Sequence, residues 1–351
     1  MHCQIFQFAG DKVKKYISKE RLDIYTKHLK VKDAQVLPAY QWNKDLAGAL
    51  LPALHCLEVT LRNSISCAIQ ENPPPAAKSL YSTGNDWIFS LTEYMGKKLI
   101  PKHLRFTKKA RHGQLVDAQG FVLDKFNKRL VVKRAWEEDK VISASKKVRN
   151  EGKLVTPDRV ISALDFGFLT NFLTKTYEDN NAKSLLWPNQ LSVVFPNAPQ
   201  GTTRDSIEKK LNRIRELRNR LTHHEAIWKF FSDDLQTGKP DYNNPVYGAL
   251  ASCSLLSKHY DDILTLVGWI SQDSLDSFLS NQGDARFRAL CCVDGLHSYI
   301  SPDKLETSFT VNRGGWGIRK VMKLISKGEM IRITRSGSTL YTIGRDTNRL
   351  F

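Results

Sequence analysis

Apolar residues recur at three- and four-residue steps through most of the first 270 residues, a spacing that is typical of amphipathic helices. The clearest repeat predicts a helix over residues 40–70 and consists of Leu50, Leu54, Leu57, Leu61 and Ile65. Pro73, Pro74 and Pro75 follow this repeat and should end the helix. A shorter amphipathic stretch predicts another helix over residues 19–30. The larger part of the chain is therefore expected to be all-α.

Similar repeats predict helices in the middle of the chain. Thr156-Pro157 combines an N-cap with a proline at the first helical position, so a helix should begin there. It should continue through Val160, Ile161, Leu164, Phe168, Phe172 and Leu173. A later helix should begin at Thr203 or Asp205 and run to about His223, with an apolar stripe of Ile207, Leu211, Ile214, Leu217 and Leu221. Trp187-Pro188 and Phe195-Pro196 mark a loop, and a second loop is expected at residues 232–245. A last amphipathic helix is expected from Leu255 to Ile270.

The pattern changes character from about residue 284. Three short helices are expected, over Arg286 to Tyr299, from Ser301-Pro302, and from about Trp316 to Lys327. The hydrophobic period then becomes two, and residues 331–334 and 339–343 flank a Ser336-Gly337 turn, which predicts a β-hairpin. This order of elements resembles a winged helix-turn-helix, although a small dimerisation or capping module has the same shape. We therefore expect a helical bundle over residues 1–283 and a basic C-terminal α/β module over residues 284–351.

The composition is that of an ordinary globular protein, with 351 residues of which 41% are hydrophobic. No apolar run reaches the length of a membrane span, and the N-terminus, with Gln4, Gln7, Asp11 and Lys12, lacks a signal-peptide core. We therefore expect a cytoplasmic protein. The cysteines lack metal-ligand spacing, so reduced and mostly buried thiols are expected at Cys3, Cys56, Cys67, Cys253, Cys291 and Cys292. Neither a metal nor another cofactor is predicted.

The net charge of +17 is concentrated in two segments. Residues 96–153 carry a net charge of +11, and residues 286–351 carry +7. Both segments contain aromatic residues, and this combination favours a polyanionic partner such as nucleic acid, although a solubilising surface would have the same charge. Inside the first segment, which we interpret as a basic insertion, residues 116–123 should form a short hairpin or loop.

One short segment has a composition that suits catalysis. In Arg218-Asn219-x-x-x-His223, a permanent cation, an amide and a titratable imidazole fall within two helical turns. Arg218 projects near the middle of the apolar stripe, so it should meet a carboxylate or a phosphate. His223 lies about 140° further round the helix, too far to share one phosphate easily, which favours a site made by two copies of the helix. The alternative is a structural ion pair at Arg218, with His223 and His224 near the helix C-terminus.

A second Arg-Asn pair occurs in the predicted helix over residues 40–70. Glu58 and Arg62 are four residues apart in the favourable order, and Asn63 follows. A surface salt bridge is one interpretation. The other makes Glu58 a buried partner of Arg62 or of Arg218, orienting the site.

Over about residues 19–280, the chain resembles the Abi-like abortive-infection proteins, an all-helical branch of the HEPN superfamily. The resemblance depends on the order of several short motifs rather than on any one of them. These are Tyr40-Gln-Trp-Asn43, Leu46-Ala-Gly-Ala-Leu50, Leu57-Glu-Val-Thr-Leu-Arg-Asn63, Leu164-Asp-Phe-Gly-Phe168, Leu186-Trp-Pro188, Phe195-Pro196 and Leu217-Arg-Asn-Arg-Leu-Thr-His-His-Glu225.

The resemblance implies a homodimeric helical bundle in which the two motif segments meet. It implies a metal-independent endoribonuclease of anti-phage defence, with Arg218 and His223 as the catalytic pair and Asn219 holding the segment in place. The sequence does not separate the role of His224 from that of His223. RNA is the expected substrate, and a regulatory non-coding RNA is a further possible partner. A non-catalytic protein that holds a structured RNA, and a DNA-binding regulator led by the C-terminal module, are the alternatives.

Overall fold

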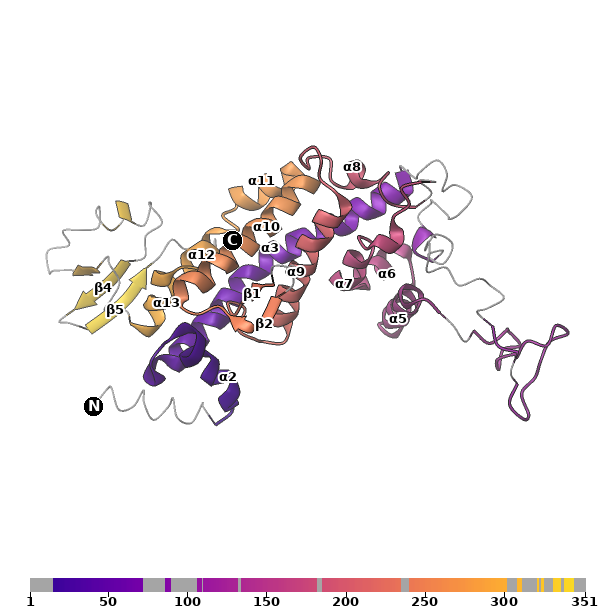
Figure 1. Cartoon of the computed structure of the whole chain (residues 1–351), viewed down its shortest axis with the longest axis horizontal. Coiled ribbons are helices and arrows are strands. Elements are labelled where there is room, and N and C mark those ends of the chain that lie inside the picture. The colour runs from indigo at the N-terminus through magenta and orange to yellow at the C-terminus, as the bar shows by residue number, and fades with distance from the viewer. Residues whose placement is uncertain are drawn as a thin grey trace. The chain divides into compact units, whose positions relative to one another are not determined.

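The structure is a computed structural model of the whole chain (Figure 1). It consists of two compact units. The residues described are 15–71, 86–89, 106–108, 110–131, 134–181, 185–234, 240–301, 308–310, 321, 323–324, 331–335 and 338–343. Unit 1 comprises residues 1–57, 216–268 and 272–351, and unit 2 comprises residues 58–215 and 269–271. The boundary falls within three helices, α3, α9 and the last turn of α10, so each unit contains part of all three.

Helix α3, Val36–Glu71, is the longest helix in the described part of the chain. It confirms the helix predicted over residues 40–70 and begins four residues earlier. The residues that predicted it are buried: Leu50, Leu54, Leu57, Leu61 and Ile65 are each less than 5% exposed. The three prolines that were expected to end it lie outside the described residues. A stripe of large aliphatic side chains at helical spacing thus gives α3 a buried face along its length.

Unit 1 is built on the first part of α3 and on α10. Helix α2, Lys19–Ile24, continues into a π-helical turn η1, Tyr25–Leu29, which confirms the helix predicted over residues 19–30. Helix α10, Ala249–Ile270, confirms the last predicted helix, and α11, Gln272–Ser280, follows it. Large aromatic side chains fill the core, and those that are at most 1% exposed include Tyr25, Trp42, Trp228, Tyr260 and Phe287.

Two predictions within unit 1 were wrong. The helix expected over Arg286 to Tyr299 is two helices, α12, Ala285–Leu290, and α13, Val293–Ile300. The break occurs because Cys292 has an extended backbone and its Sγ accepts a hydrogen bond from the Gly295 amide, which starts a new helix. The loop expected over residues 232–245 contains two antiparallel strands, β1, Phe231–Asp233, and β2, Pro240–Pro245. These strands are largely solvent-accessible, so their polar composition resembles that of a loop.

The C-terminal hairpin was predicted correctly. Strands β4, Ile331–Arg335, and β5, Ser338–Ile343, pair antiparallel, and Figure 1 shows them side by side. A third strand, β3, Ser308–Thr310, pairs parallel with β4 and was not expected from the sequence. Residues 321, 323 and 324 are helical, within the helix predicted from about 316. The small α/β module is therefore present, and its assignment as a winged helix stays a prediction.

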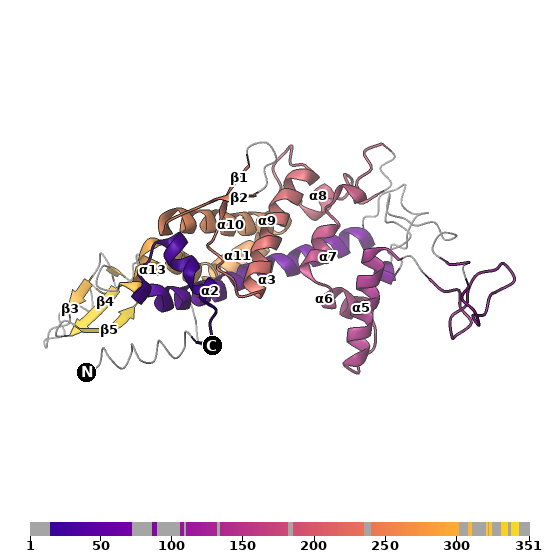
Figure 2. The ribbon, with the colours of Figure 1, turned by 60° about the horizontal axis from the view of Figure 1, so that its bottom comes forward.

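Unit 2 contains short helices, and Figure 2 shows α5 beside α6. The bounds are α5, Trp136–Asn150; α6, Pro157–Ala163; α7, Phe166–Asn171; the 3₁₀ turn η6, Lys175–Tyr177; and α8, Leu191–Val194. The single helix expected from Thr156 through Leu173 is two helices. The chain is extended at Leu164 and Asp165, and the Asp165 carboxylate accepts a hydrogen bond from the Phe168 amide at 2.8 Å, so α7 has its own N-cap.

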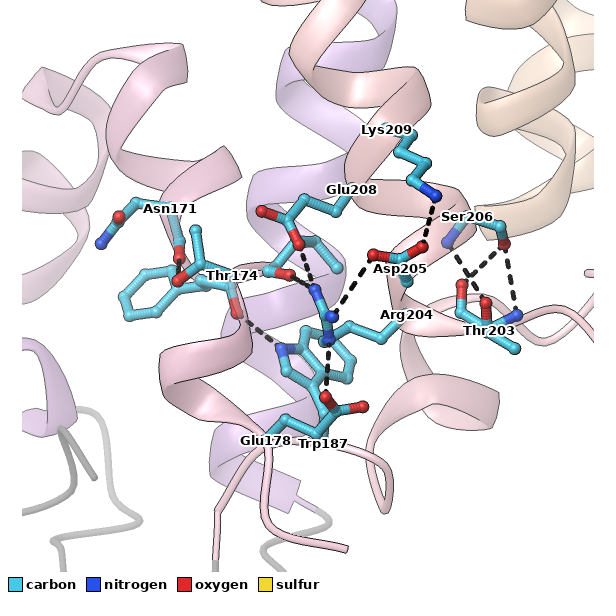
Figure 3. A network of polar contacts seen from close by, with 12 residues as sticks. Asn171, Thr174, Glu178, Trp187, Thr203, Arg204, Asp205, Ser206, Glu208 and Lys209 are labelled. Carbon is cyan, nitrogen blue, oxygen red and sulfur yellow. Dashed lines mark hydrogen bonds and ion pairs between the residues drawn. The ribbon is translucent and has the colours of Figure 1, made fainter. Parts of the chain in front are cut away.

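Helix α9, Arg204–Thr222, confirms the predicted motif helix. Of the two expected caps, Thr203 is the one observed, because its Oγ1 accepts a hydrogen bond from the Ser206 amide at 3.2 Å. Arg204 is 6% exposed and anchors this end of the helix in unit 2 (Figure 3). Its guanidinium donates to the Leu173 carbonyl at 2.5 Å and forms ion pairs with Glu208 and Glu178.

The basic insertion contains a small antiparallel module over residues 106–131. Its backbone bridges join Val116 to Val122, Leu123 to Arg129, and Phe106 to Val131. The short hairpin expected over residues 116–123 is therefore present. Gly113 and Gly120 both have positive φ angles, 82° and 79°, as turn residues of this module.

The thiols only partly follow the prediction. Cys253 and Cys291 are buried, Cys56 and Cys292 are half-buried, and Cys67 is exposed, whereas Cys3 lies outside the described residues. For the cysteines of the described ranges, the expectation of mostly buried thiols was therefore wrong. Cys67 lies in an apolar stretch of α3 but on the side of the helix away from the buried stripe. None of the helices in the described ranges combines the length and apolar character that a membrane span requires.

Candidate functional site

The Arg218 motif lies at the C-terminal end of α9, within unit 1. The apolar stripe predicted for this helix is buried at Ile207, Leu211, Ile214 and Leu217, which are at most 2% exposed. Arg218, next to Leu217, is half-buried, whereas Asn219 is exposed. The arginine therefore lies at the border of the buried face, and the amide lies on the solvent side.

Helix α9 ends immediately before the two histidines. Its last helical residue is Thr222, and His224 has a left-handed backbone with a φ of 55°. The His224 amide donates to the Leu221 carbonyl at 3.1 Å, and the Glu225 amide donates to the Arg220 carbonyl at 2.9 Å. This pair of hydrogen bonds is a Schellman motif, which satisfies carbonyls that the helix leaves without a partner. Both imidazoles are exposed at this turn.

A residue from α2 contacts the same turn. Nη1 of Arg21 donates to the His224 carbonyl at 3.2 Å, and Nη2 lies 3.4 Å from the His223 carbonyl. A guanidinium at a helix C-terminus is favoured by the partial negative charge of the exposed carbonyls. Arg21 thus helps to fix the backbone that carries both imidazoles.

A buried residue of α3 holds the chain just after the turn. Asn43 is 3% exposed, and its amide side chain accepts a hydrogen bond from the Ile227 amide at 3.2 Å and donates to the Glu225 carbonyl at 3.3 Å. Next to it, Trp228 is fully buried, with its ring 5.2 Å from that of Tyr25. The histidines are therefore exposed on a turn whose far side is embedded in the core of unit 1.

The neighbouring arginine, Arg220, has a structural role. Its guanidinium donates to the Lys229 carbonyl and lies 5.6 Å from the ring of Phe230, so it connects the end of α9 to the chain that follows. Arg218 differs from it. Within the described ranges, no carboxylate lies at ion-pair distance from Arg218, and its guanidinium makes no hydrogen bond. The carboxylate partner expected for Arg218 is therefore not observed within those ranges.

The second Arg-Asn pair belongs to unit 2 and is described within it. Arg62 donates to Glu58 at 2.8 Å, with only 14% and 21% of the two side chains exposed. The ion pair is thus partly buried rather than on the open surface, and a role of Glu58 and Arg62 in orienting the site stays a prediction. Asn63 is exposed. The other predicted residues, Arg218, Asn219, His223 and His224, belong to unit 1, at the end of α9 and in the turn that follows it.

The sequence did not identify Arg21 and Asn43 as residues that position the site. Asn43 did belong to a recognised motif, Tyr40-Gln-Trp-Asn43, and the structure explains why that motif accompanies the later one: its amide binds the chain after the histidines. Trp42 of the same motif is fully buried and donates to the Leu290 carbonyl at 2.9 Å. Arg21 is 202 residues from His223 in the chain, and no local pattern marks such a contact.

The fold and the site together define a mostly helical protein with an arginine and two histidines at a fixed helix end. The family model described as Abi-like protein matches residues 7–229, which is more than half of the chain and includes the whole motif. The chain therefore belongs to the Abi-like family. No curated protein and no solved structure matches it. Residues after 229, including the C-terminal module, lie outside the match, whereas the resemblance had been expected to reach about residue 280.

Proposed function

We propose that this protein is an endoribonuclease of abortive-infection defence that cuts RNA without a metal ion, at a HEPN-type site made of Arg218 and His223. Membership of the Abi-like family supports a defence role. The observation that carries the catalytic part is the helix end itself. There, the guanidinium of Arg218 has no ion-pair or hydrogen-bond partner within the described part of unit 1, and two exposed imidazoles follow it in the chain. Arg21 and Asn43 hold the backbone of this turn.

The reaction follows from the chemistry of these side chains. An imidazole with an ordinary pKa of about 6.5 can accept the proton of a ribose 2′-hydroxyl, which then attacks the adjacent phosphate. The guanidinium of Arg218 neutralises charge on the phosphate oxygens as the transition state forms. The P–O5′ bond breaks as the 2′-oxygen attacks, and the leaving 5′-oxygen takes up a proton from the imidazolium or from water. The products are a 2′,3′-cyclic phosphate and a 5′-hydroxyl end. DNA lacks the attacking hydroxyl and should remain intact.

Each subunit would contribute part of the site. Arg218 and His223 are five positions apart, a spacing that on a regular helix turns the two side chains about 140° apart. Two antiparallel copies of the helix end in a homodimer would bring the arginine of one subunit to the histidine of the other. Asn219, exposed beside Arg218, would hold the facing segment, and His224 would orient the substrate.

The test is cleavage of labelled RNA by the purified protein in EDTA. Arg218→Ala and His223→Ala should each reduce the rate at least about 100-fold, because each removes a group that acts in the transition state. Arg159→Ala and His55→Ala are the matched controls, because both side chains are exposed and lie outside the motif. The controls should keep the wild-type rate.

Two outcomes would contradict the proposal. Cleavage that persists in Arg218→Ala or His223→Ala would show that another site cuts the RNA. The second outcome combines two observations: the protein cuts no RNA, even when its host cells are infected by phage, and both variants still bind RNA tightly. That outcome would favour the non-catalytic RNA-binding alternative.

A further inference from the structure

The basic insertion contains an exposed aromatic side chain at the tip of a rigid turn, and this feature has no part in the proposed cleavage site. The module over residues 106–131 is held by contacts around Phe121, which is 9% exposed. Lys108 and Arg129 lie over this ring, at 4.7 Å and 4.4 Å from its centre, and Phe106 packs against it edge-on at 6.0 Å. Arg129 also donates to Asp117 at 2.6 Å. Phe121 is thus a core residue of this small module.

The second turn of the module is fixed by an aspartate. The Asp124 carboxylate accepts hydrogen bonds from the Phe126 amide at 2.8 Å and from the Lys128 amide at 3.0 Å. The Asp124 amide donates to the Lys128 carbonyl at 2.7 Å, and Asn127 takes a left-handed backbone with a φ of 58°. Asn and Asp are the residues that best tolerate such turns. The backbone at the tip is therefore ordered by its own hydrogen bonds.

Phe126 is the side chain that this turn exposes. It is 69% exposed, with the ammonium of Lys125 at 5.0 Å from its ring, and Lys128 is exposed on its other side in the sequence. An apolar ring that is so exposed contributes little to the stability of the fold. Because the backbone is already fixed, a ligand that covers the ring loses little conformational entropy of the protein.

We propose that Phe126, Lys125 and Lys128 form a binding site for single-stranded RNA, in which an unpaired base stacks on the phenyl ring. Exposed aromatic rings flanked by cations bind single strands in this way, because every base offers a π-face and every nucleotide a phosphate. The net charge of +11 over residues 96–153 is complementary to such a ligand. The two lysines would contact the phosphates on either side of the stacked base.

A membrane surface fits the same tip less well. Stable membrane anchoring needs more buried apolar surface than one ring supplies. The choice of RNA rests on the proposed ribonuclease function, but stacking does not require cleavage. A binding assay with an uncleavable RNA therefore tests the site separately from the catalytic residues.

The probe is a fluorescent twelve-nucleotide oligoadenylate with 2′-O-methyl groups, which removes the hydroxyl that the proposed chemistry needs. Fluorescence anisotropy with the full-length protein should show that Phe126→Ala weakens binding about tenfold, whereas Phe126→Trp restores it. Lys125→Ala with Lys128→Ala should lower the steepness of the salt dependence by roughly 1.4 in log–log slope, about 0.7 for each lost phosphate contact on a single strand.

Two controls separate this site from general surface effects. Tyr242 is 70% exposed but is flanked by Asp241 and Asn243, so Tyr242→Ala should not change the affinity. Lys209 is 76% exposed and is paired with Asp205, so Lys209→Ala should leave the salt dependence of RNA binding unchanged. A duplex RNA of the same length, whose bases are stacked inside the helix, should bind Phe126→Ala and wild type equally.

The proposal fails if Phe126→Ala binds the oligoadenylate as tightly as the wild type does. It also fails if the substitution weakens duplex and single strand alike, or if it instead releases the protein from vesicles of phosphatidylcholine and phosphatidylserine. Loss of RNA cleavage in His223→Ala with retained oligoadenylate binding is expected, because the two sites are independent.

Discussion

At His224, the effect of the backbone conformation on stability must be separated from the chemical role of the side chain. Its φ of 55° at the C-terminal turn of α9 is a conformation that costs a non-glycine residue about 1 kcal/mol, and glycine is the usual residue at this position. His224→Gly should therefore leave the free energy of unfolding within about 0.5 kcal/mol of the wild type. His224→Val should lower it by about 2 kcal/mol, because a β-branched side chain is strained there. Urea denaturation measures both.

The same glycine variant assigns the two imidazoles. It removes the ring of His224 without disturbing the turn, so RNA cleavage should become slower, because the substrate is less well oriented, but should continue if His223 transfers the proton. Cleavage that disappears in His224→Gly while the protein stays folded would move the catalytic role to His224. His223→Val is the stability control, since His223 does not have a positive φ and the substitution should cost less than about 1 kcal/mol.

A third histidine predicts the pH dependence of stability. His28 is 4% exposed and stacks on Tyr247 at 5.4 Å, and burial, followed by the positive charges of Lys229, Lys27 and Lys30, lowers the pKa of its imidazole. A hydrogen bond with the backbone of Val246 acts in the opposite direction but is outweighed. Below the ordinary histidine pKa of about 6.5, the unfolded chain therefore binds more protons at this position than the folded chain does. The stability from His28 is present above that pH and is lost as the pH falls.

The measurement is the difference in unfolding free energy between pH 7.5 and pH 5.5. Wild type should lose more stability on acidification than His28→Phe, which cannot be protonated. The difference is independent of whatever His28→Phe does to stability at neutral pH. His55→Phe, at an exposed position on α3, should keep the wild-type difference. An identical loss in wild type and His28→Phe would show that other groups dominate the acid response.

Individual residues were predicted well where the local pattern sets their environment. Helical projection placed Arg218 near the middle of the apolar stripe, whereas it lies at the border of the buried face. The burial of Leu217 does follow from helical periodicity. The contacts of Arg21 and Asn43 with the segment after α9 do not, because they join residues about 180 to 200 positions apart. Which distant side chain reaches a helix end depends on packing that a single sequence does not display.

At the scale of elements, the N-terminal end of α9 depends on one buried cation. Arg204 is 6% exposed and joins Glu178, Glu208 and the Leu173 carbonyl (Figure 3). Arg204→Met should lower the free energy of unfolding by about 3 kcal/mol, because it leaves two partly buried carboxylates without their cation. Arg204→Lys should also be destabilising, since one ammonium does not reproduce the planar guanidinium. Thermal or urea denaturation provides the test.

The adjacent exposed ion pair is the natural control for this network. Lys209 bonds to Asp205 at 2.8 Å, with 76% and 57% of the side chains exposed. Lys209→Met should change the free energy of unfolding by less than about 0.5 kcal/mol, because solvent screens the pair. Equal effects of Arg204→Met and Lys209→Met would mean that burial of Arg204 contributes nothing.

Helices were predicted by their periodicity, but their interruptions were not. The apolar spacing from Val160 to Leu173 continues across the extended residues at Leu164 and Asp165, so the pattern conceals the break. Cys292 similarly starts a new helix within a stretch that looks continuous. In both places the break is made by a side chain that accepts a hydrogen bond from a backbone amide three residues later. Such caps compete locally with the helix and leave its hydrophobic period unchanged.

For the whole molecule, the distribution of charge and the division into units suggest separate tasks. The motif turn is built in unit 1, by residues of α2, α3 and α9. The exposed ring of Phe126 belongs to unit 2, in a segment where much of the positive charge is concentrated. Both features are explained if one part of the chain binds RNA strands and the other cuts them. The proposed dimer adds a requirement, because the arginine and the histidine of one cleavage site must come from two different subunits.

That requirement can be tested by combining two inactive variants. If Arg218 of one subunit acts with His223 of the other, a heterodimer of Arg218→Ala and His223→Ala contains one site with both wild-type residues and one site with neither. Co-expression with two different affinity tags allows this heterodimer to be isolated, and it should cut RNA at about half of the wild-type rate. Each homodimer should be inactive.

A heterodimer of Arg218→Ala with the double variant has no intact site and is the matched control. A heterodimer as inactive as its parents would exclude the shared site, and so would a protein that cuts RNA while it sediments as a monomer. Recovery of activity has no explanation within a single subunit, because neither parent chain contains both groups.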